Sequence, residues 1–181
     1  MNLPNKITMI RLLLVPIFII VFYIYPDSHI YAAIIFIIAS LTDSLDGYIA
    51  RSKGLITDFG KFIDPLADKI LVSAALILLV EIGKIPGWVV IIIIAREFTI
   101  TGFRIIAASE GITIAASPLG KIKTITQLTG IILMLLDNII FSHFNIPMDI
   151  IIIYISLVFT ILSGIDYIGK NWGVLNINKE N

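Results

Sequence analysis

Residues 43–68 read DSLDGYIARSKGLITDFGKFIDPLAD and lie where two long apolar runs meet. An α-helix turns about 100° per residue, so five residues at the start of this stretch fall within an arc of roughly 140°. They are Asp43, Asp46, Gly47, Ala50 and Arg51. The same arithmetic places Gly60, Lys61, Asp64 and Asp68 within roughly 100° on the next helix. We therefore predict that two helix ends present two carboxylates each to one shared space.

This cluster of carboxylates indicates a metal site. Four neighbouring carboxylates repel one another, and a hard divalent cation such as Mg²⁺ or Mn²⁺ relieves that repulsion. Two such ions could clamp a phosphoryl group. Gly47 and Ala50 leave room for a ligand, and the fork of Arg51 suits a diphosphate. The alternative is that Asp43 and Asp46 only cap a helix while Arg51 anchors it at the membrane surface.

The spacing D-x2-D-G-x2-A-R-x8-G-x3-D-x3-D resembles, without a departure, the signature of the CDP-alcohol phosphotransferases. These membrane enzymes displace CMP from a CDP-linked alcohol with a second alcohol. The resemblance implies that two metal ions bind to Asp43, Asp46, Asp64 and Asp68. It implies that Asp68 is also the general base. It further implies that the CDP group is held by Asp46, Gly47, Ala50, Arg51 and Gly60.

The composition excludes an ordinary soluble domain, because 58% of the 181 residues are hydrophobic and only 14% are charged. Apolar runs near membrane-spanning length recur. They cover residues 8–25, 30–51, 61–82, 86–107, 121–141 and 147–168. We predict an all-α integral membrane bundle of six transmembrane helices, formed by one domain over 1–181. A short N-terminal juxtamembrane segment precedes it and a polar tail at 170–181 follows. Because Pro65 disfavours a helical Asp64, the third helix is expected to begin near Asp64 or to kink there.

The basic residues are segregated by side. One set of loops and ends holds Lys6, Arg11, Arg51, Lys53, Lys61, Arg104, Lys121, Lys123, Lys170 and Lys179, and the opposite loops hold Lys84 alone. Under the positive-inside rule, both termini and the aspartates lie on the cytoplasmic side. The predicted location is the bacterial plasma membrane. The chain has no cysteine, no internal repeat and no nucleic-acid signature, so thiolate chemistry and a nucleic-acid partner are excluded.

The N-terminal segment, residues 2–11, looks like the juxtamembrane segment of bacterial family members. Asn5, Thr8 and Arg11 are possible ligand contacts there. The alternative is a basic anchor whose side chains reach the lipid headgroups.

Charged residues also occur inside the fourth and fifth runs. Arg96 and Glu97 lie deep in the fourth run, where charges usually line a polar cavity, and Glu97 shares a helix face with Arg104. Lys123 and Gln127 share a face of the fifth run. A second cationic patch beside a metal site suggests an anionic acceptor. Its phosphate would contact Arg96, Arg104, Lys121 and Lys123, with Gln127 as a possible further contact. The alternatives are an interhelical ion pair for Glu97 and positive-inside anchoring for the lysines.

The segments AREF at 95–98, GFR at 102–104 and GKIKTITQ at 120–127 look like those of phosphatidylglycerophosphate synthases within the family. This resemblance implies transfer of a phosphatidyl group from CDP-diacylglycerol to glycerol 3-phosphate, and a homodimer in the lipid bilayer. Inositol phosphate, serine or phosphatidylglycerol remain alternative acceptors. A cation channel or transporter with an aspartate-lined path is the alternative from another functional class. The last apolar run carries the least information.

Overall fold

The computed structural model describes the backbone of residues 3–53, 58–109, 112, 114 and 117–171. It describes the side chains of residues 8–42, 66–67, 69–108, 112, 114 and 117–171. Within these residues the chain forms seven α-helices and no strand, which confirms the all-α prediction. They are α1 (Leu3–Ile24), α2 (Ile30–Lys53), α3 (Asp58–Glu81), α4 (Gly87–Ser109), α5 (Pro118–Leu135), α6 (Ile139–Ser142) and α7 (Met148–Asn171).

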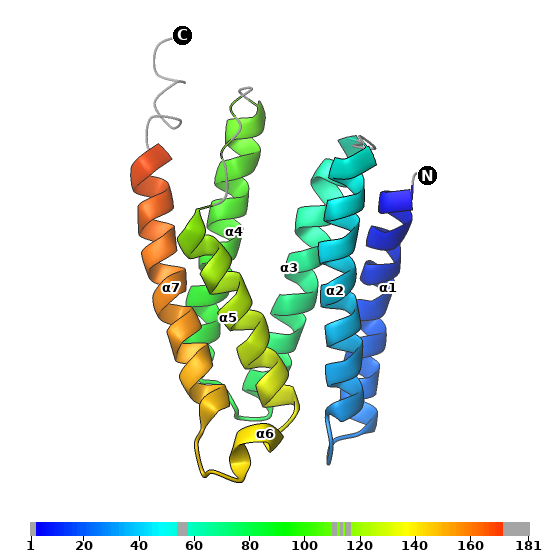
Figure 1. Ribbon diagram of the computed structural model, residues 1–181, viewed down its shortest axis with the longest axis vertical. Helices are drawn as coiled ribbons and strands as arrows, with labels where there is room; N and C mark the ends of the chain where they lie inside the picture. The colour runs from blue at the N-terminus through cyan, green and yellow to red at the C-terminus, as the bar shows by residue number, and fades with distance from the viewer. Residues whose placement is uncertain (1–2, 54–57, 110–111, 113, 115–116, 172–181) are drawn as a thin grey trace.

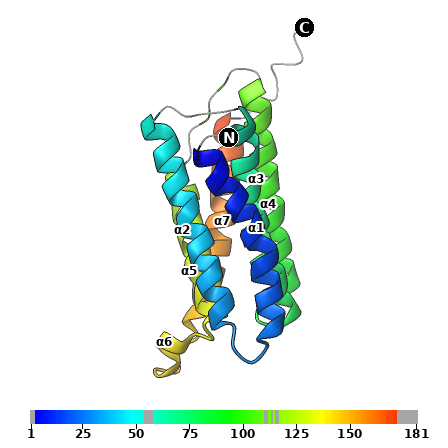
Figure 2. The ribbon, with the colours of Figure 1, turned by 90° about the vertical axis from the view of Figure 1, so that its right-hand side faces the viewer.

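The long helices run alternately up and down along one bundle (Figure 1). The start of α1, the end of α2, the start of α3 and the ends of α4 and α7 all lie at the same end of the bundle, with the short α6 at the other end (Figures 1 and 2). The most extensive contacts join α1 to α2 and α3, and join α7 to α4 and α5. Smaller contacts of α3 and α2 with α4 and α5 connect these two groups of helices.

The helix lengths match the thickness of a bilayer. The 18 residues of α5 and the 24 residues of α7 correspond to about 27 Å and 36 Å, against a hydrocarbon core of about 30 Å. Among the described residues, one helix, Met148–Asn171, is both long and apolar enough to cross a membrane. Shorter apolar helical stretches cover Thr8–Ile24 and Ile30–Thr42. The helical bundle is therefore confirmed, whereas six membrane spans stay a prediction.

Three helix boundaries differ from those predicted. The N-terminal segment is not separate, because α1 begins at Leu3 and includes it. Helix α3 begins at Asp58 and continues through Pro65, so a start near Asp64 is wrong. The fifth run does not extend to residue 141. Asp137 and Asn138 adopt φ values of 53° and 54°, in the left-handed region that Asn and Asp tolerate best, and α5 ends before them at Leu135.

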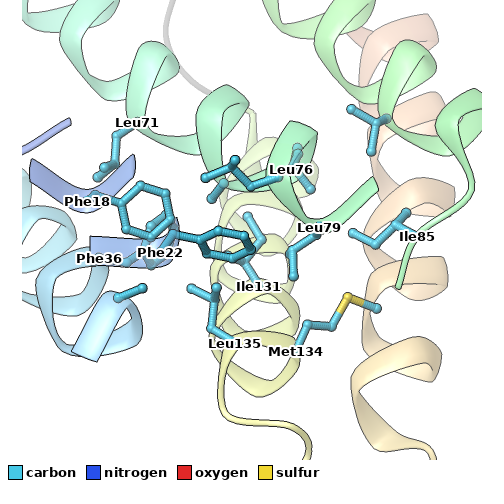
Figure 3. Close-up of a cluster of buried hydrophobic side chains, with 14 of the residues drawn as sticks. Phe18, Phe22, Phe36, Leu71, Leu76, Leu79, Ile85, Ile131, Met134 and Leu135 are labelled. Atoms are coloured by element: carbon cyan, nitrogen blue, oxygen red, sulfur yellow. The ribbon is translucent and has the colours of Figure 1, made fainter. Parts of the chain in front are cut away.

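The largest apolar core draws residues from all six long helices, and Figure 3 shows part of it. Phe18 is fully buried and contacts both Phe22 and Phe36, with ring centroids 6.3 Å and 6.0 Å away in tilted geometries. Further members of this core are Leu71, Leu76 and Leu79 of α3, Ile131, Met134 and Leu135 of α5, Val89, Val90 and Ile93 of α4, and Ile153 and Leu157 of α7. The three rings come from neighbouring turns of α1 and α2, so aromatic packing fixes how these two helices meet.

The outer surface of α1 is as apolar as its buried face. Ile10, Leu13, Ile17, Ile20 and Ile24 recur every three or four residues and are each 46–62% exposed. A helix in water keeps polar residues on such a face, whereas a helix in lipid does not. The exposed surface of α1 therefore suits an acyl-chain environment.

Two contacts hold α5 in place. Lys84, in the loop between α3 and α4, donates to the carbonyl oxygen of Met134 at 2.5 Å and forms an ion pair with Asp137. Lys84 thus adds to the backbone N–H of Asp137, which donates to the same carbonyl at 3.2 Å, and the two contacts close the end of α5. Near the middle of the same helix, Gly130 meets α7 so closely that an added Cβ would lie 2.8 Å from Cγ1 of Ile153.

Candidate active site

The aspartate stretch occupies the adjoining ends of α2 and α3. Asp43 and Asp46 belong to α2, and Asp64 and Asp68 belong to α3. Gly47, Ala50 and Arg51 follow in α2, and Gly60 lies in the first turn of α3. Both segments are helical, so the premise of the arc calculation is confirmed, and both lie at one end of the bundle (Figure 1). The side chains of these eight residues lie outside the described part of the structure.

The donor set suits hard cations, because carboxylate oxygens are the ligands that Mg²⁺ and Mn²⁺ prefer. The side chains that the structure describes contain no other group of three or more His, Asp or Glu residues that could hold a metal ion. The metal hypothesis therefore rests on Asp43, Asp46, Asp64 and Asp68.

A polar cavity of about 210 Å³ lies among α3, α4, α5 and α7. We call it the arginine cavity, because Arg96 and Arg104 of α4 both line it. Lys69 of α3, Ser117 and Gly120 at the start of α5, and Tyr167 of α7 also line it. Two guanidinium groups and an ammonium group around one space favour an anionic ligand, and the planar guanidinium fork matches phosphate oxygens.

The start of α5 adds to this positive potential. Ser117 is the N-cap residue, and its Oγ accepts from the backbone N–H of Gly120 at 3.1 Å. Pro118 follows in the first helical turn, where its fixed φ is tolerated and its missing N–H costs nothing. A helix N-terminus carries a partial positive charge, so it reinforces the attraction of the two arginines for an anion.

Arg96 is held on its α7 side by several contacts. Its Nη2 donates to Oγ of Ser163 at 2.9 Å, and its aliphatic stem lies against Gly164. Its Nε has no hydrogen-bond partner among the described residues. The guanidinium is thus fixed at Nη2 and buried at Nε, while the side chain as a whole lines the arginine cavity.

Glu97 links three helices. Its Oε2 lies 3.2 Å from Nζ of Lys69 in α3, and its Oε1 pairs with Nζ of Lys123 in α5. Lys123 is only 1% exposed. The alternative that Glu97 forms an interhelical ion pair is therefore confirmed, and Glu97 also lines the arginine cavity together with Arg104. Because Lys69 directly follows Asp68, this carboxylate ties the aspartate-bearing helix to the helix that carries the arginines.

The predicted acceptor residues are divided between two spaces. Arg96 and Arg104 share the arginine cavity, whereas Lys123 and Gln127 line a neighbouring space of about 50 Å³. Glu97 lies in the wall of both. The amide of Gln127 is buried, and neither its oxygen nor its nitrogen has a hydrogen-bond partner within the described part of the chain. Lys121 is exposed and lines neither space.

Two of the three N-terminal candidates are buried in the bundle. Thr8 and Arg11 are each 1% exposed, while the side chain of Asn5 lies outside the described residues. An arginine that anchors a helix at the lipid headgroups keeps its guanidinium accessible to water. The burial of Arg11 therefore favours a role inside the protein over an anchor.

Four residues of the site were not predicted from the sequence: Lys69 of α3 and Ser163, Gly164 and Tyr167 of α7. A signal for the α7 residues was present. The buried face of α7 includes Ser156, Thr160, Ser163, Gly164 and Tyr167, which recur at helical spacing in an otherwise apolar helix. Small and polar residues on one face of a membrane helix indicate close packing or polar contacts with neighbouring helices.

An all-helical bundle that places an aspartate-rich end beside a cationic cavity defines a class of protein suited to phosphate-bearing substrates at a membrane surface. The family model described as CDP-alcohol phosphatidyltransferase matches residues 1–162 of this chain. The chain therefore belongs to the CDP-alcohol phosphatidyltransferase family.

Its relatives share most of their length with it. A Bacillus subtilis protein named CDP-diacylglycerol–glycerol-3-phosphate 3-phosphatidyltransferase is 46% identical, over 96% of this chain and 97% of its own. A Rickettsia bellii protein with the same name is 37% identical, over 92% and 93% of the two chains. A Mycobacterium tuberculosis protein named probable phosphatidylglycerophosphate synthase is 35% identical, over 93% and 81%.

Proposed function

We propose that this protein transfers the phosphatidyl group of CDP-diacylglycerol to sn-glycerol 3-phosphate, which yields phosphatidylglycerophosphate and CMP. The names of the relatives support this assignment over nearly the whole chain. The structural observation that carries it is the convergence of Arg96 and Arg104 on one cavity beside the helix that bears Asp68. A cationic cavity of this kind suits an acceptor that has its own phosphate.

The donor substrate is assigned to the aspartate end. Gly47, Ala50, Arg51 and Gly60, with Asp46, hold the CDP group, and the guanidinium of Arg51 pairs with the diphosphate. Two divalent ions, Mg²⁺ or Mn²⁺, are assigned to Asp43, Asp46, Asp64 and Asp68, whose carboxylates match the oxygen ligands of hard cations. When bound, these ions neutralise charge on the diphosphate and on the departing CMP.

The reaction is a displacement at phosphorus. Asp68 removes the proton from the acceptor hydroxyl, whose oxygen then forms a bond to the β-phosphorus. The bond between that phosphorus and the bridging oxygen breaks, and the electron pair leaves with CMP. Lys69 follows Asp68 in the chain and lines the arginine cavity, so an acceptor in this cavity lies next to the helix that carries the base.

The acceptor is assigned to the arginine cavity. The forks of Arg96 and Arg104 bind its phosphate, aided by the positive start of α5. The sequence also predicts that Lys121 and Lys123 contact the acceptor's phosphate, and this stays a prediction that substitution of each lysine can test. Serine and free glycerol lack a phosphate and leave two guanidinium groups without a counter-ion, so they should be poor acceptors.

We further propose that the six long helices all cross the plasma membrane. In this arrangement both termini and the aspartates lie on the cytoplasmic side, where nucleotide and glycerol 3-phosphate are available. The segregation of lysine and arginine supports this orientation. The apolar outer face of α1 supports lipid contact. A homodimer is implied by the family resemblance.

An acceptor panel tests the function. The purified protein is supplied with CDP-diacylglycerol, divalent metal and one acceptor at a time, and both CMP and the lipid product are measured. Glycerol 3-phosphate should be used at least about tenfold better than serine or glycerol, because a charge-assisted contact contributes roughly 1.5–3 kcal/mol. Robust product from serine, inositol phosphate or phosphatidylglycerol, with little from glycerol 3-phosphate, would overturn the acceptor assignment. The absence of CMP release with every acceptor, together with metal-ion flux in vesicles, would instead support a transporter.

A further inference from the structure

We propose that Ser163 of α7 is a positioning residue, which fixes Arg96 in the orientation that the acceptor's phosphate requires. The inference rests on the proposed function, in which Arg96 binds that phosphate. It assigns a role in acceptor binding to α7, a helix in which no site residue was predicted from the sequence.

The contact between Ser163 and Arg96 is a buried side-chain hydrogen bond between two helices. Nη2 of Arg96 in α4 donates to Oγ of Ser163 at 2.9 Å. Ser163 is 0% exposed, and its own Oγ donates to the carbonyl oxygen of Thr160 at 3.2 Å. Because the serine proton is used within α7, the oxygen has a lone pair directed at the guanidinium, which fixes the direction of the Arg96 contact.

The next residue of α7 controls the stem of the same arginine. An added Cβ at Gly164 would lie 3.2 Å from Cγ and 3.7 Å from Nε of Arg96. A glycine at this position lets the arginine lie directly against the α7 backbone. Ser163 therefore holds the end of the side chain, while Gly164 leaves the space that its stem occupies.

This arrangement prepares Arg96 for an anion. Arginine has a long side chain with many rotamers, and its planar fork loses less freedom on binding when it is already oriented. Nη2 of Arg96 contacts Ser163, and Nε is buried against α7 without a hydrogen-bond partner among the described residues. Arg96 also lines the arginine cavity. The terminal N–H groups that Ser163 does not use are thus the donors assigned to phosphate oxygens.

The test is the substitution Ser163→Ala in the full-length protein, which removes one hydroxyl from a buried site. The KM for glycerol 3-phosphate should rise about tenfold, as expected for the loss of one oriented hydrogen bond to a charged group. The KM for CDP-diacylglycerol should stay within about twofold. Ser156→Ala is the matched control, because Ser156 is also fully buried in α7 and its hydroxyl has no partner among the described residues. It should leave both KM values unchanged.

A double-mutant cycle separates positioning from general packing. Arg96→Gln should raise the KM for glycerol 3-phosphate, and adding Ser163→Ala to Arg96→Gln should cause no further rise, because Ser163 acts through Arg96. Independent, additive effects would overturn the inference. So would an unchanged KM in Ser163→Ala while Arg96→Gln raises it, and this outcome would leave the proposed function intact. If Arg96→Gln itself does not affect use of glycerol 3-phosphate, the assignment of the acceptor site fails first.

A second variant covers the case in which Ser163→Ala does not fold. Gly164→Ala adds a methyl group against the arginine stem and should displace Arg96 without removing any polar group. Titration calorimetry of the purified variant with glycerol 3-phosphate should show affinity about tenfold weaker than that of the native protein. Native affinity in a folded Gly164→Ala protein would contradict the role of α7.

Discussion

In the proposed metal site the aspartates act through their negative charge, so a neutral residue of the same shape should not replace them. Asp46→Asn keeps the size of the side chain but removes an anionic oxygen that a hard cation requires. We expect CMP release to fall about a hundredfold or more. The protein should retain its helical circular dichroism and its melting temperature.

Asp68→Asn provides the contrast, because it removes the proposed base as well as one metal ligand. It should be inactive while still binding CDP-diacylglycerol through the residues of α2. An Asp46→Asn protein that kept most of its turnover would show that the metal assignment is wrong.

His29 should give the protein a pH-dependent stability. It precedes α2, is 6% exposed and stacks on Phe22 with ring centroids 4.0 Å apart. Burial lowers the pKa of His29 below its ordinary value, and the charge of Lys84 lowers this pKa further, while Asp137 acts in the opposite direction. Since the unfolded chain binds the proton more readily, the stabilisation is complete above the unfolded pKa of about 6.5. This stabilisation is lost as the pH falls through the lower pKa that His29 has in the folded protein.

The measurement is the melting temperature of the purified protein between pH 8 and pH 5, a range that extends about 1.5 pH units to either side of the unfolded histidine pKa. His29→Phe retains an aromatic ring against Phe22 and cannot titrate, so its melting temperature should fall less over the same range. His143→Phe is the control, because His143 is exposed. Equal pH dependence in the native and His29→Phe proteins would exclude this explanation.

At the scale of the elements, the contact of α5 with α7 depends on one glycine. A Cβ at Gly130 would lie 2.8 Å and 2.9 Å from the side chain of Ile153 and 3.3 Å from its backbone nitrogen. Because the backbone of α7 is part of this contact, a rotamer change of Ile153 alone cannot relieve it. Gly130→Ala should therefore destabilise the bundle by about 1–3 kcal/mol.

Gly102→Ala is the matched control, since a Cβ there would have nothing within 4 Å. This change should be neutral or slightly stabilising, as alanine is the better helix former. Thermal unfolding of the two variants in the same detergent compares them directly. Equal melting temperatures would mean that α5 and α7 can move apart without loss of stability, which would contradict the prediction.

The helices themselves could be predicted because long apolar runs separated by polar turns leave few alternatives. Their ends were harder to predict. Asp137 and Asn138 stop α5 by adopting positive φ, which an apolar run does not reveal. Pro65 was expected to limit α3, yet the helix continues through it. Neighbouring helices can stabilise a helix whose proline removes one hydrogen bond.

The candidate site was predictable where a few residues alone carry its chemistry. The aspartate spacing and the two arginines are visible in the sequence. The partners of those arginines are not visible, because Ser163 lies 67 positions from Arg96 and meets it only after α4 and α7 pack. Glu97 is similar. Its charge could be noticed in the sequence, whereas its pairing with Lys69 and Lys123 depends on how three helices are placed.

At the scale of the whole molecule, the orientation in the membrane can be tested with single cysteines. The native chain has no cysteine, so labelling has no background. Ser52→Cys and Ser117→Cys should react only with reagents that enter the cytoplasm, whereas Ser28→Cys should react with impermeant reagents in intact cells. This expectation follows from the concentration of lysine and arginine in the loops and ends on one side of the predicted bundle. Labelling of Ser52→Cys from outside the cell would show that the proposed topology is reversed. The aspartates would then lie on the side of the membrane that cytoplasmic substrates do not reach.

The bundle consists of two groups of helices, α1 with α2 and α3, and α4 with α5 and α7. The aspartates belong to the first group, while most of the arginine cavity belongs to the second. Glu97 connects the groups through Lys69 and Lys123. If the donor nucleotide is bound by one group and the acceptor by the other, mutations in the second group can alter the accepted alcohol without disturbing the chemistry of the first. Such a division would let descendants of one ancestral gene acquire new lipid headgroups through changes in α4, α5 and α7, while selection keeps the aspartate spacing in α2 and α3 unchanged.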